Sequence, residues 1–330
     1  MSIQEIDQIS ITILMDNSTD FLLINSKHAV RPPFIKNDKF ILPPPVAEHG
    51  FSALISITKS EQGTGNLFLF DTGVSENGVI HNADIFDIDF SNIDGIILSH
   101  GHFDHFAGLV NILKRTSSSP KGTRNNSVNF FTHPDAFLRR WEILPDGKRA
   151  KSPILDEIQL QQLGAKIHKN TGDTCLPSNK SPLLAISGEI PRQTSFEKGF
   201  PYQYAEDPRN EKSLIPDPLI KDDQALVVNI LSKGLVILTG CGHAGVINTI
   251  NYAKKITGID RIHAIIGGFH LPADGRIYEA AIEPTLKEFQ KTQPDYVVSC
   301  HCTGWKATNR IIEIMPEKFI QSSVGTTFQF

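Results

Sequence analysis

The sequence has few cysteines, little net charge and no long apolar run. Four cysteines in 330 residues are too few for a disulfide scaffold. The formal net charge of −4 provides no basic field for nucleic acid. No apolar run reaches the about 18 residues of a membrane span, and the start MSIQEIDQIS lacks the features of a signal peptide. We therefore expect a cytoplasmic protein that binds neither nucleic acid nor membranes.

The bulk composition is that of an ordinary globular protein. Hydrophobic residues make up 40% of the chain and charged residues 21%, close to the average for this class. A length of 330 residues suits a large two-sheet sandwich with insertions. We expect one domain that spans residues 1–330. Oligomeric state leaves no mark in the sequence.

Hydrophobic patterns predict alternating strands and helices. A polar, proline-bearing stretch at 16–48 is typical of a surface loop. The run at 94–100 is short and nearly all apolar, as in a strand that is buried on both faces. Other strands are predicted at 9–15, 51–58, 66–70, 128–133, 165–169, 182–188, 225–230, 235–240, 262–268 and 295–300. Helices are predicted from residue 106 onward and at 244–256, 278–291 and 305–315.

A long polar segment interrupts this pattern at 191–223. It contains five prolines and many charges. Such a length is unusual for a simple connection between elements of a compact domain. The segment is therefore predicted to be a lid or an insertion that shapes a substrate pocket.

The densest group of reactive side chains follows the strand at 94–100. His100, His102, Asp104 and His105 fall within six positions, although the whole chain has only 12 histidines. Imidazole and carboxylate are ligands for zinc and related metals. His100 and His102 alternate in the sequence, and Asp104 and His105 come as a helix begins. This spacing predicts a binuclear metal site rather than a chance cluster on a surface loop.

His-x-His-x-Asp-His after a strand resembles the signature of the metallo-β-lactamase superfamily. Asp71 in FDTG resembles the aspartate that closes the first hairpin of that fold. Cys241 in LVILTGCGHAG lies where the superfamily has a bridging Asp or Cys, and His301 in DYVVSCHCTGW resembles its last metal-binding histidine. The resemblance extends from about His49 to His301. It implies a four-layer αββα sandwich of two mixed β-sheets flanked by helices, with each half of the chain supplying one sheet.

A narrower resemblance concerns the motifs TGCGHAGVINTI, IIGGFHL and CHCTGW, together with NSTD and SVGTTF. These are similar to the branch named for a dihydropterin–ribofuranosylaminobenzene phosphate synthase. The sequence departs from the superfamily pattern at one point. Many members have a third histidine of the first metal site between the two main motifs, and this sequence has none there. Glu189 in SGEIPR or His243 is the candidate replacement.

The resemblance implies a site with two metal ions, zinc or else manganese or iron. His100 and His102 would hold the first ion, with His243 or Glu189. Asp104, His105 and His301 would hold the second, with Cys241 as a bridge. Asp104 would also orient the attacking water, and His270 would act near the leaving group.

Several of these residues also have a structural interpretation. His243 is a metal or substrate ligand or a helix cap, and His270 is a proton-transfer group or a buried hydrogen-bonded histidine. Cys241 is a ligand or a small core residue. Strand alternation predicts that Cys300 and Cys302 point away from His301 and serve packing.

Three further residues are candidates for contact with an anionic substrate. Arg192 and Lys198 would hold a phosphate or carboxylate, or belong to a solvated loop. His133 would touch the pocket, or be structural.

Three functions agree with the sequence. The first is a metal-dependent hydrolase that acts on a small-molecule ester, phosphate ester or lactone. The second is a synthase of the dihydropterin-linked type. The third is a non-catalytic protein that binds or senses metal, against which the complete ligand set argues.

Overall fold

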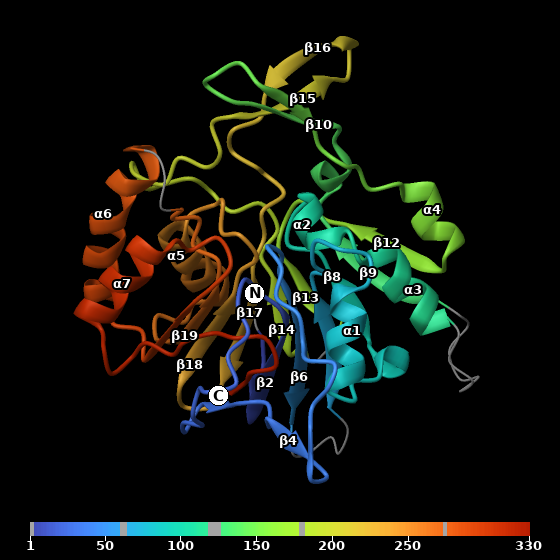
Figure 1. The fold of residues 1–330 in the computed structure, drawn as a ribbon. Helices are drawn as coiled ribbons and strands as arrows, with labels where there is room; N and C mark the ends of the chain where they lie inside the picture. The colour runs from blue at the N-terminus through green and yellow to red at the C-terminus, as the bar shows by residue number, and fades with distance from the viewer. Residues whose placement is uncertain (1–2, 60–64, 118–126, 178–181, 273–275) are drawn as a thin grey trace.

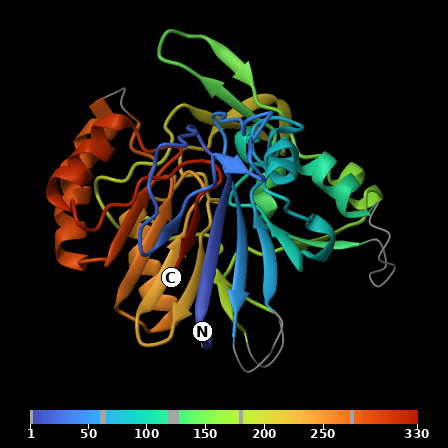
Figure 2. The ribbon, with the colours of Figure 1, turned by 60° about the horizontal axis from the view of Figure 1, so that its bottom comes forward.

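Two β-sheets lie face to face in the computed structural model of the chain, and helices cover the outer face of each sheet (Figure 1). The structure describes residues 3–59, 65–117, 127–177, 182–272 and 276–330. Figure 2 shows helices on both sides of the central strands. This mixed αββα sandwich confirms the predicted fold class.

The first sheet contains strands from the N-terminal half of the chain and one from the C-terminus. Its order is β12 (Ala165–Lys169), β9 (Val128–Thr132), β8 (Gly95–Ile97), β7 (Asn66–Phe70), β6 (Ser52–Thr58), β2 (Gln8–Met15), β21 (Thr327–Gln329) and β3 (Ala29–Val30). A separate small hairpin pairs β4 (Ile35–Lys36) with β5 (Lys39–Phe40).

The second sheet contains mainly strands from the C-terminal half. Its order is β13 (Thr174–Leu176), β14 (Leu184–Ile186), β17 (Leu226–Ile230), β18 (Gly234–Leu238), β19 (Ile262–Gly267) and β20 (Tyr296–Ser299). β1 (Glu5–Ile6) pairs in parallel with β17. The expectation that each half supplies one sheet is wrong at the two ends, because β1 joins the second sheet and β21 joins the first.

Inward-facing side chains of both sheets form the core between them. Ile9, Ile11 and Ile13 alternate along β2 and are fully buried there. The central strands β17, β18 and β19 of the second sheet are buried on both faces; in β17, for example, Leu226 faces the other sheet and Val227 packs under the helices. Full burial of each such aliphatic side chain contributes about 1.5–3 kcal/mol relative to exposure.

The helices form the two outer layers. α1 (Gly78–Ile85), α2 (Phe103–Phe106), α3 (Leu109–Ser117) and α4 (Glu157–Gln162) lie on the side of the first sheet, and α5 (Val246–Thr257), α6 (Arg276–Thr292) and α7 (Trp305–Ile314) cover the second. Within the described ranges, none of these helices has the length and apolarity needed to cross a membrane.

The helix predicted after the histidine loop is divided into α2 and α3. A side chain at Gly108 would place its Cβ 2.4 Å from the carbonyl oxygen of Thr72. The chain therefore needs glycine where it passes the loop after β7. This close approach holds the histidine loop against the first sheet.

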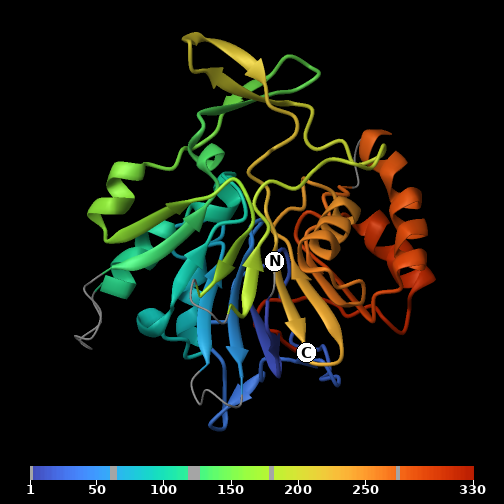
Figure 3. The same ribbon diagram turned by 180° about the vertical axis from the view of Figure 1, so that it is seen from behind.

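The segment 191–223 forms part of a third sheet. β15 (Gln203–Asp207) and β16 (Asn210–Pro216) form an antiparallel hairpin, which pairs with β10 (Arg140–Ile143) and then β11 (Arg149–Lys151). This cap sheet projects from the sandwich on the side of α2, as the view from behind also shows (Figure 3). Residues 140–151, which we did not assign to the insertion, belong to the same cap sheet.

Candidate metal centre

Strand ends from both sheets meet at one edge of the sandwich. β7 and β8 are parallel neighbours, as are β18, β19 and β20. Parallel strands place their carboxyl ends at the same edge of a sheet. The loops that follow these ends carry Asp71, 99–105, 241–243, His270 and 301–302. Residues far apart in the sequence are therefore brought together.

Three imidazoles form the first group of ligand atoms. Nε2 of His100 lies 3.0 Å from Nδ1 of His102, and Nε2 of His243 lies 3.1 Å from that same atom. Tetrahedral zinc with Zn–N bonds of about 2.0–2.1 Å separates two nitrogen ligands by roughly 3.3 Å. Burial and neighbouring imidazoles lower the pKa of His100 and of His243, which favours the neutral form that binds metal. The three nitrogens therefore fit one divalent cation.

A carboxylate, an imidazole and two thiols form the second group. Oδ2 of Asp104 lies 3.3 Å from Nε2 of His301, which lies 3.3 Å from Sγ of Cys241. Sγ of Cys302 lies 3.2 Å from Sγ of Cys241. The four ligand atoms are all within 4.8 Å of one another. This set also fits a divalent metal, because zinc accepts oxygen, nitrogen and sulfur ligands.

Cys241 connects the two groups. Nε2 of His105 lies 3.1 Å from Sγ of Cys241. His100, His105 and Cys241 form a third candidate group that overlaps the first two. The thiol thus lies between the three-imidazole group and the carboxylate, where a bridging ligand would be.

Hydrogen bonds to the ring nitrogens that face away from the site orient the ligand imidazoles. Nδ1 of His105 donates to Oδ2 of Asp71 over 2.7 Å, which leaves Nε2 to face the site. Nδ1 of His100 is 2.9 Å from Oγ of Ser99, and that hydroxyl donates to the same Asp71 oxygen over 2.7 Å. Partners of this kind determine which nitrogen of a ligand histidine carries the proton.

The third oriented imidazole is held by the cap sheet. Nε2 of His102 donates to Oε1 of Gln203 on β15 in a close contact. The Gln203 amide donates over 3.0 Å to Oδ2 of Asp217, which also accepts from Nε of Arg140 over 3.0 Å. The cap sheet is therefore hydrogen-bonded directly to a candidate metal ligand, His102.

Arg140 forms the buried centre of this network. Its side chain is 1% exposed and donates from both terminal nitrogens to Asp222. Burial by itself would raise the pKa of Asp222, but the Arg140 guanidinium lowers it to about 2. Oδ2 of Asp222 also accepts from the backbone N–H of Gly101 over 2.7 Å, so the network continues into the histidine loop.

Three site residues have a left-handed backbone. The φ angle is 58° at Asp71, 44° at His270 and 46° at His301. This conformation costs about 1–2 kcal/mol for a residue with a side chain, and such residues cluster at functional sites. Asp16 and Asn17 hold His301 in place, because Oδ1 of Asp16 accepts its N–H over 3.0 Å and Nδ2 of Asn17 donates to its carbonyl over 2.8 Å.

The prediction that Cys302 points away from the site is wrong. The left-handed turn at His301 interrupts the strand alternation on which that prediction depended. Cys302 consequently turns back towards Cys241, and its half-buried side chain lines the site. Cys300 packs in the core between the sheets, as expected.

Two further candidate residues have contacts that differ from the expected ones. Glu189 is exposed and belongs to none of the three ligand groups, so the structure does not support its interpretation as a metal ligand. His243 occupies the third position of the first group instead. The guanidinium of Arg192 donates to main-chain carbonyls, among them those of Ile190 and Ile220, and so is engaged in holding loops.

Of the other two candidates for substrate contact, Lys198 lies at a cavity and His133 has a structural contact. Lys198 lines a small cavity together with His243 and His270. Nδ1 of His133 accepts from the backbone N–H of Asp135 over 3.1 Å and so caps the 3-10 turn Pro134–Phe137. The structural interpretation of His133 is thus the one that its contacts support.

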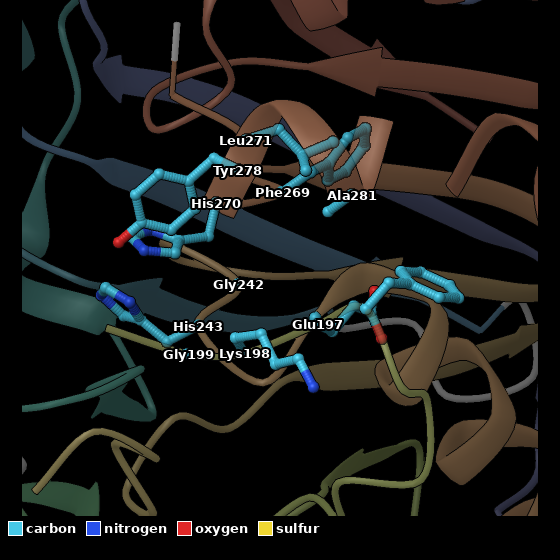
Figure 4. Close-up of a pocket in the computed structure, with 12 residues that line it drawn as sticks. Glu197, Lys198, Gly199, Gly242, His243, Phe269, His270, Leu271, Tyr278 and Ala281 are labelled. Atoms are coloured by element: carbon cyan, nitrogen blue, oxygen red, sulfur yellow. The ribbon is translucent and has the colours of Figure 1, made fainter. Parts of the chain in front are cut away.

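Two cavities adjoin the ligand groups. The larger has a volume of about 530 Å³; its wall includes His49, His301, Cys302 and Trp305, and contains no lysine or arginine among its lining residues. The smaller, of about 20 Å³, lies between His243, His270, Tyr278 and Lys198. Figure 4 shows the rings of His270 and Tyr278 side by side, near His243. His270 lines both cavities.

The sequence analysis missed several residues that are not candidate ligands themselves but hold the ligands in place, either by direct contact or through a neighbour. These residues are Asp16, His49, Arg140 and Gln203. NSTD, which begins at Asn17, was a usable signal for the first of them. The polar residues of the cap sheet show no signal, because they follow the same pattern as a solvated loop.

Replacement of Gln203 by Leu should weaken metal binding about 10–100-fold, as is typical when the partner of a ligand histidine is lost. The variant removes the acceptor that keeps the proton of His102 on Nε2. Gln203→Glu keeps an acceptor oxygen and should bind nearly as well as the wild type. Competition with a chromophoric chelator measures the zinc dissociation constant, and equal affinity of the Leu variant would contradict the orienting role.

The fold and the donor set together define the class of protein: an αββα sandwich with candidate metal-ligand groups where the two sheets meet. A family model described as the metallo-beta-lactamase superfamily matches residues 52–172. The structure of Tm1679, a metal-dependent hydrolase of the beta-lactamase superfamily, aligns with a TM-score of 0.70 and 22% identity over 97% of this chain and 98% of that one. The protein YhfI from Bacillus subtilis aligns with a TM-score of 0.52 and 13% identity, over 98% and 100%.

Comparison of the sequence with those of known proteins shows to which branch of the superfamily the chain is similar. The chain is 30% identical over 86% of its length, and 90% of the relative's, to 7,8-dihydropterin-6-methyl-4-(beta-D-ribofuranosyl)-aminobenzene-5'-phosphate synthase of Methanocaldococcus jannaschii. An uncharacterized protein of the same organism is 28% identical over 84% of this chain and 92% of its own length. The chain therefore belongs to the metallo-beta-lactamase superfamily, in the branch that contains this synthase.

Proposed function

We propose that the protein is a metal-dependent hydrolase of a small-molecule ester, phosphate ester or lactone. The observation that carries this proposal is the pair of adjoining ligand groups, one of three imidazoles and one around Asp104 and His301, linked through Cys241. A cavity of about 530 Å³ opens beside the second group, within the range of sites for small molecules. Two residues of the second group, His301 and Cys302, thus border a space that a substrate can enter.

Two zinc ions are the proposed occupants, with manganese or iron as alternatives, because sites of imidazole and carboxylate accept all three. Bound there, the metals would lower the pKa of a water towards ~7 and stabilise negative charge that develops on the substrate. Asp104 is suited to orient the attacking water. Burial opposes its ionisation, but His105 and His301 hold the pKa of its carboxyl well below the usual range.

His270 is the proposed proton donor to the leaving group. Both of its ring nitrogens are shielded from solvent, and its side chain is close to the thiol of Cys302. The ring centroid of His270 is 4.0 Å from that of His243 and so lies at the edge of the first ligand group. Lys198, across the smaller cavity, is the proposed contact for an anionic substituent (Figure 4).

A synthase of the kind named for the Methanocaldococcus jannaschii relative is the second candidate. The identity of 30% over 90% of that relative favours it. The larger cavity favours it also, because Trp305 at its wall is 77% exposed and offers a flat surface on which a heteroaromatic ring could stack. The same metal centre would then serve bond formation at a dihydropterin rather than attack by water.

The test is a substrate screen with the protein reconstituted with zinc, manganese or iron. We expect release of p-nitrophenol from mono- and diester phosphates, or opening of a lactone. Lys198→Met should raise KM for the anionic substrates. In parallel, 4-(β-D-ribofuranosyl)aminobenzene 5'-phosphate is supplied with a dihydropterin that carries a leaving group on its 6-methyl carbon. Joining of these two without hydrolysis would favour the synthase, and turnover in neither assay would favour a binding or sensing role.

A further inference from the structure

The thiols of Cys241 and Cys302 face each other at the second ligand group. The sequence analysis had assigned Cys302 to packing. Sγ of Cys241 and Sγ of Cys302 are 3.2 Å apart. Two thiolates on tetrahedral zinc, with Zn–S bonds of about 2.3 Å, stand roughly 3.8 Å apart, and a disulfide brings its sulfurs to about 2.05 Å. The observed separation lies between these values, so small side-chain rotations lead to either state.

We propose that Cys302 and Cys241 together form a dithiolate metal site with Asp104 and His301, and that peroxide opens this site by joining the two sulfurs. The proposal deepens the proposed function, because it rests on the same metal centre and assigns it a redox response. All four ligand atoms lie within 4.8 Å of one another. Two sulfur ligands favour zinc over harder cations such as magnesium or calcium.

The backbone around His301 is what directs Cys302 to this site. The φ angle of 46° at His301 turns the chain after β20. Asp16 and Asn17 hold that turn through the N–H and carbonyl of His301, over 3.0 Å and 2.8 Å. The position of Cys302 is therefore held by contacts from the other end of the chain and is not an accident of a loose loop.

The two thiols differ in access to solvent. Cys241 is buried at 1% exposure, whereas Cys302 is half-buried and lines the cavity of about 530 Å³. A small oxidant in that cavity meets Cys302 first. The structure thus provides one accessible thiol and one buried thiol within reach of it, an arrangement common in redox-sensing proteins.

The chemistry balances with hydrogen peroxide as the oxidant. The Cys302 thiolate attacks one peroxide oxygen, the O–O bond breaks, and Cys302 sulfenic acid and hydroxide result. The Cys241 thiolate then attacks the Cys302 sulfur, the S–S bond forms, and a second hydroxide leaves. The two sulfurs lose two electrons and the peroxide gains them. The disulfide is a poor metal ligand, so the second group releases its ion, and a dithiol reductant restores it.

The first experiment counts thiolate ligands. The protein is loaded with Co²⁺, whose sulfur-to-metal charge-transfer absorption scales with the number of bound thiolates. Cys302→Ser should reduce this absorption clearly, since the single sulfur–metal bond of Cys302 is lost, and Cys241→Ser should reduce it at least as much, since Cys241 lies between the two groups. Cys175→Ser is the matched control and should leave it unchanged. If the Cys302→Ser variant keeps the absorption of the wild type, the proposal is wrong. Metal bound by that variant would in this case still support the proposed function.

The second experiment needs no variant. The zinc-loaded wild type is treated with hydrogen peroxide, and released zinc is followed with a chromophoric chelator while peptide mass spectrometry locates disulfides. We expect a Cys241–Cys302 bridge, release of one ion per chain and reversal by dithiothreitol. Zinc release without that bridge, or the bridge without release, would overturn the proposal. A protein that binds no metal before oxidation would overturn both this proposal and the proposed function.

Discussion

An Asp104→Ala variant is expected to lose about 10²–10⁴-fold in turnover, the usual contribution of a group that positions a proton or water in the transition state. Oδ2 of Asp104 lies 3.3 Å from Nε2 of His301 and 3.6 Å from Nε2 of His105. The variant removes the oxygen ligand of the second group. It should still fold, because the Asp104 contact that holds β6 uses its backbone carbonyl, which accepts from Phe51 over 3.2 Å.

Elemental analysis of the purified variant checks this expectation independently of any substrate. Wild type should hold about two metals per chain and Asp104→Ala about one, because only the second group loses a ligand. Glu189→Ala is the control, since it removes an exposed carboxylate outside the ligand groups. His102→Ala should instead deplete the first group. Full activity and metal content in Asp104→Ala would refute the assignment of Asp104.

Replacement of Arg140 by Met should destabilise the protein by about 3–5 kcal/mol, the typical cost of removing one partner of a buried ion pair. Arg140 is 1% exposed, and its loss leaves Asp222, itself fully buried, without its cation. Asp217 and the Gln203 contact to His102 also lose their anchor. The same change should therefore weaken metal binding at the first group, through a residue that touches no ligand.

The free energy of unfolding, measured with urea, tests this prediction. Arg139→Met is the matched control: the Arg139 side chain is 55% exposed and its contact with Glu206 is 3.8 Å, so a change of about 0–1 kcal/mol is expected. A similarly small change in Arg140→Met would contradict the structural role of the network.

The stability difference between wild type and Arg140→Met should depend on pH. The Arg140 guanidinium lowers the pKa of Asp222 to about 2, against an ordinary value of about 3.9. An acid with a depressed pKa contributes stability above its unfolded-state pKa and loses it as pH falls through the folded-state value. The difference should therefore be complete above about pH 4 and decrease towards about pH 2. A difference independent of pH across this range would argue against an ionised Asp222.

Much of the architecture could be predicted from local sequence. β12 coincides with its predicted range, β18 begins one residue before its predicted start, and α7 ends one residue before its predicted end. The histidine loop stood out because its residues are neighbours in the chain and follow a buried strand. Errors arose where an element depends on a distant partner: β1 and β21 are too short to show which sheet they join, and the cap sheet combines β10 with a hairpin some 60 residues later.

The sequence by itself determined the fold class and the residues His100, His102, Asp104 and His105 as candidate ligands. The candidate ligands stand out by their short spacing after a buried strand, and the fold class follows from the family resemblance that this motif carries. Only the tertiary structure decided that His243 rather than Glu189 joins the first group and that Cys302 faces the second. Cys302 is placed by a backbone turn at His301 that Asp16 holds from 285 residues away, and contacts across such distances exist only once the two sheets have packed together.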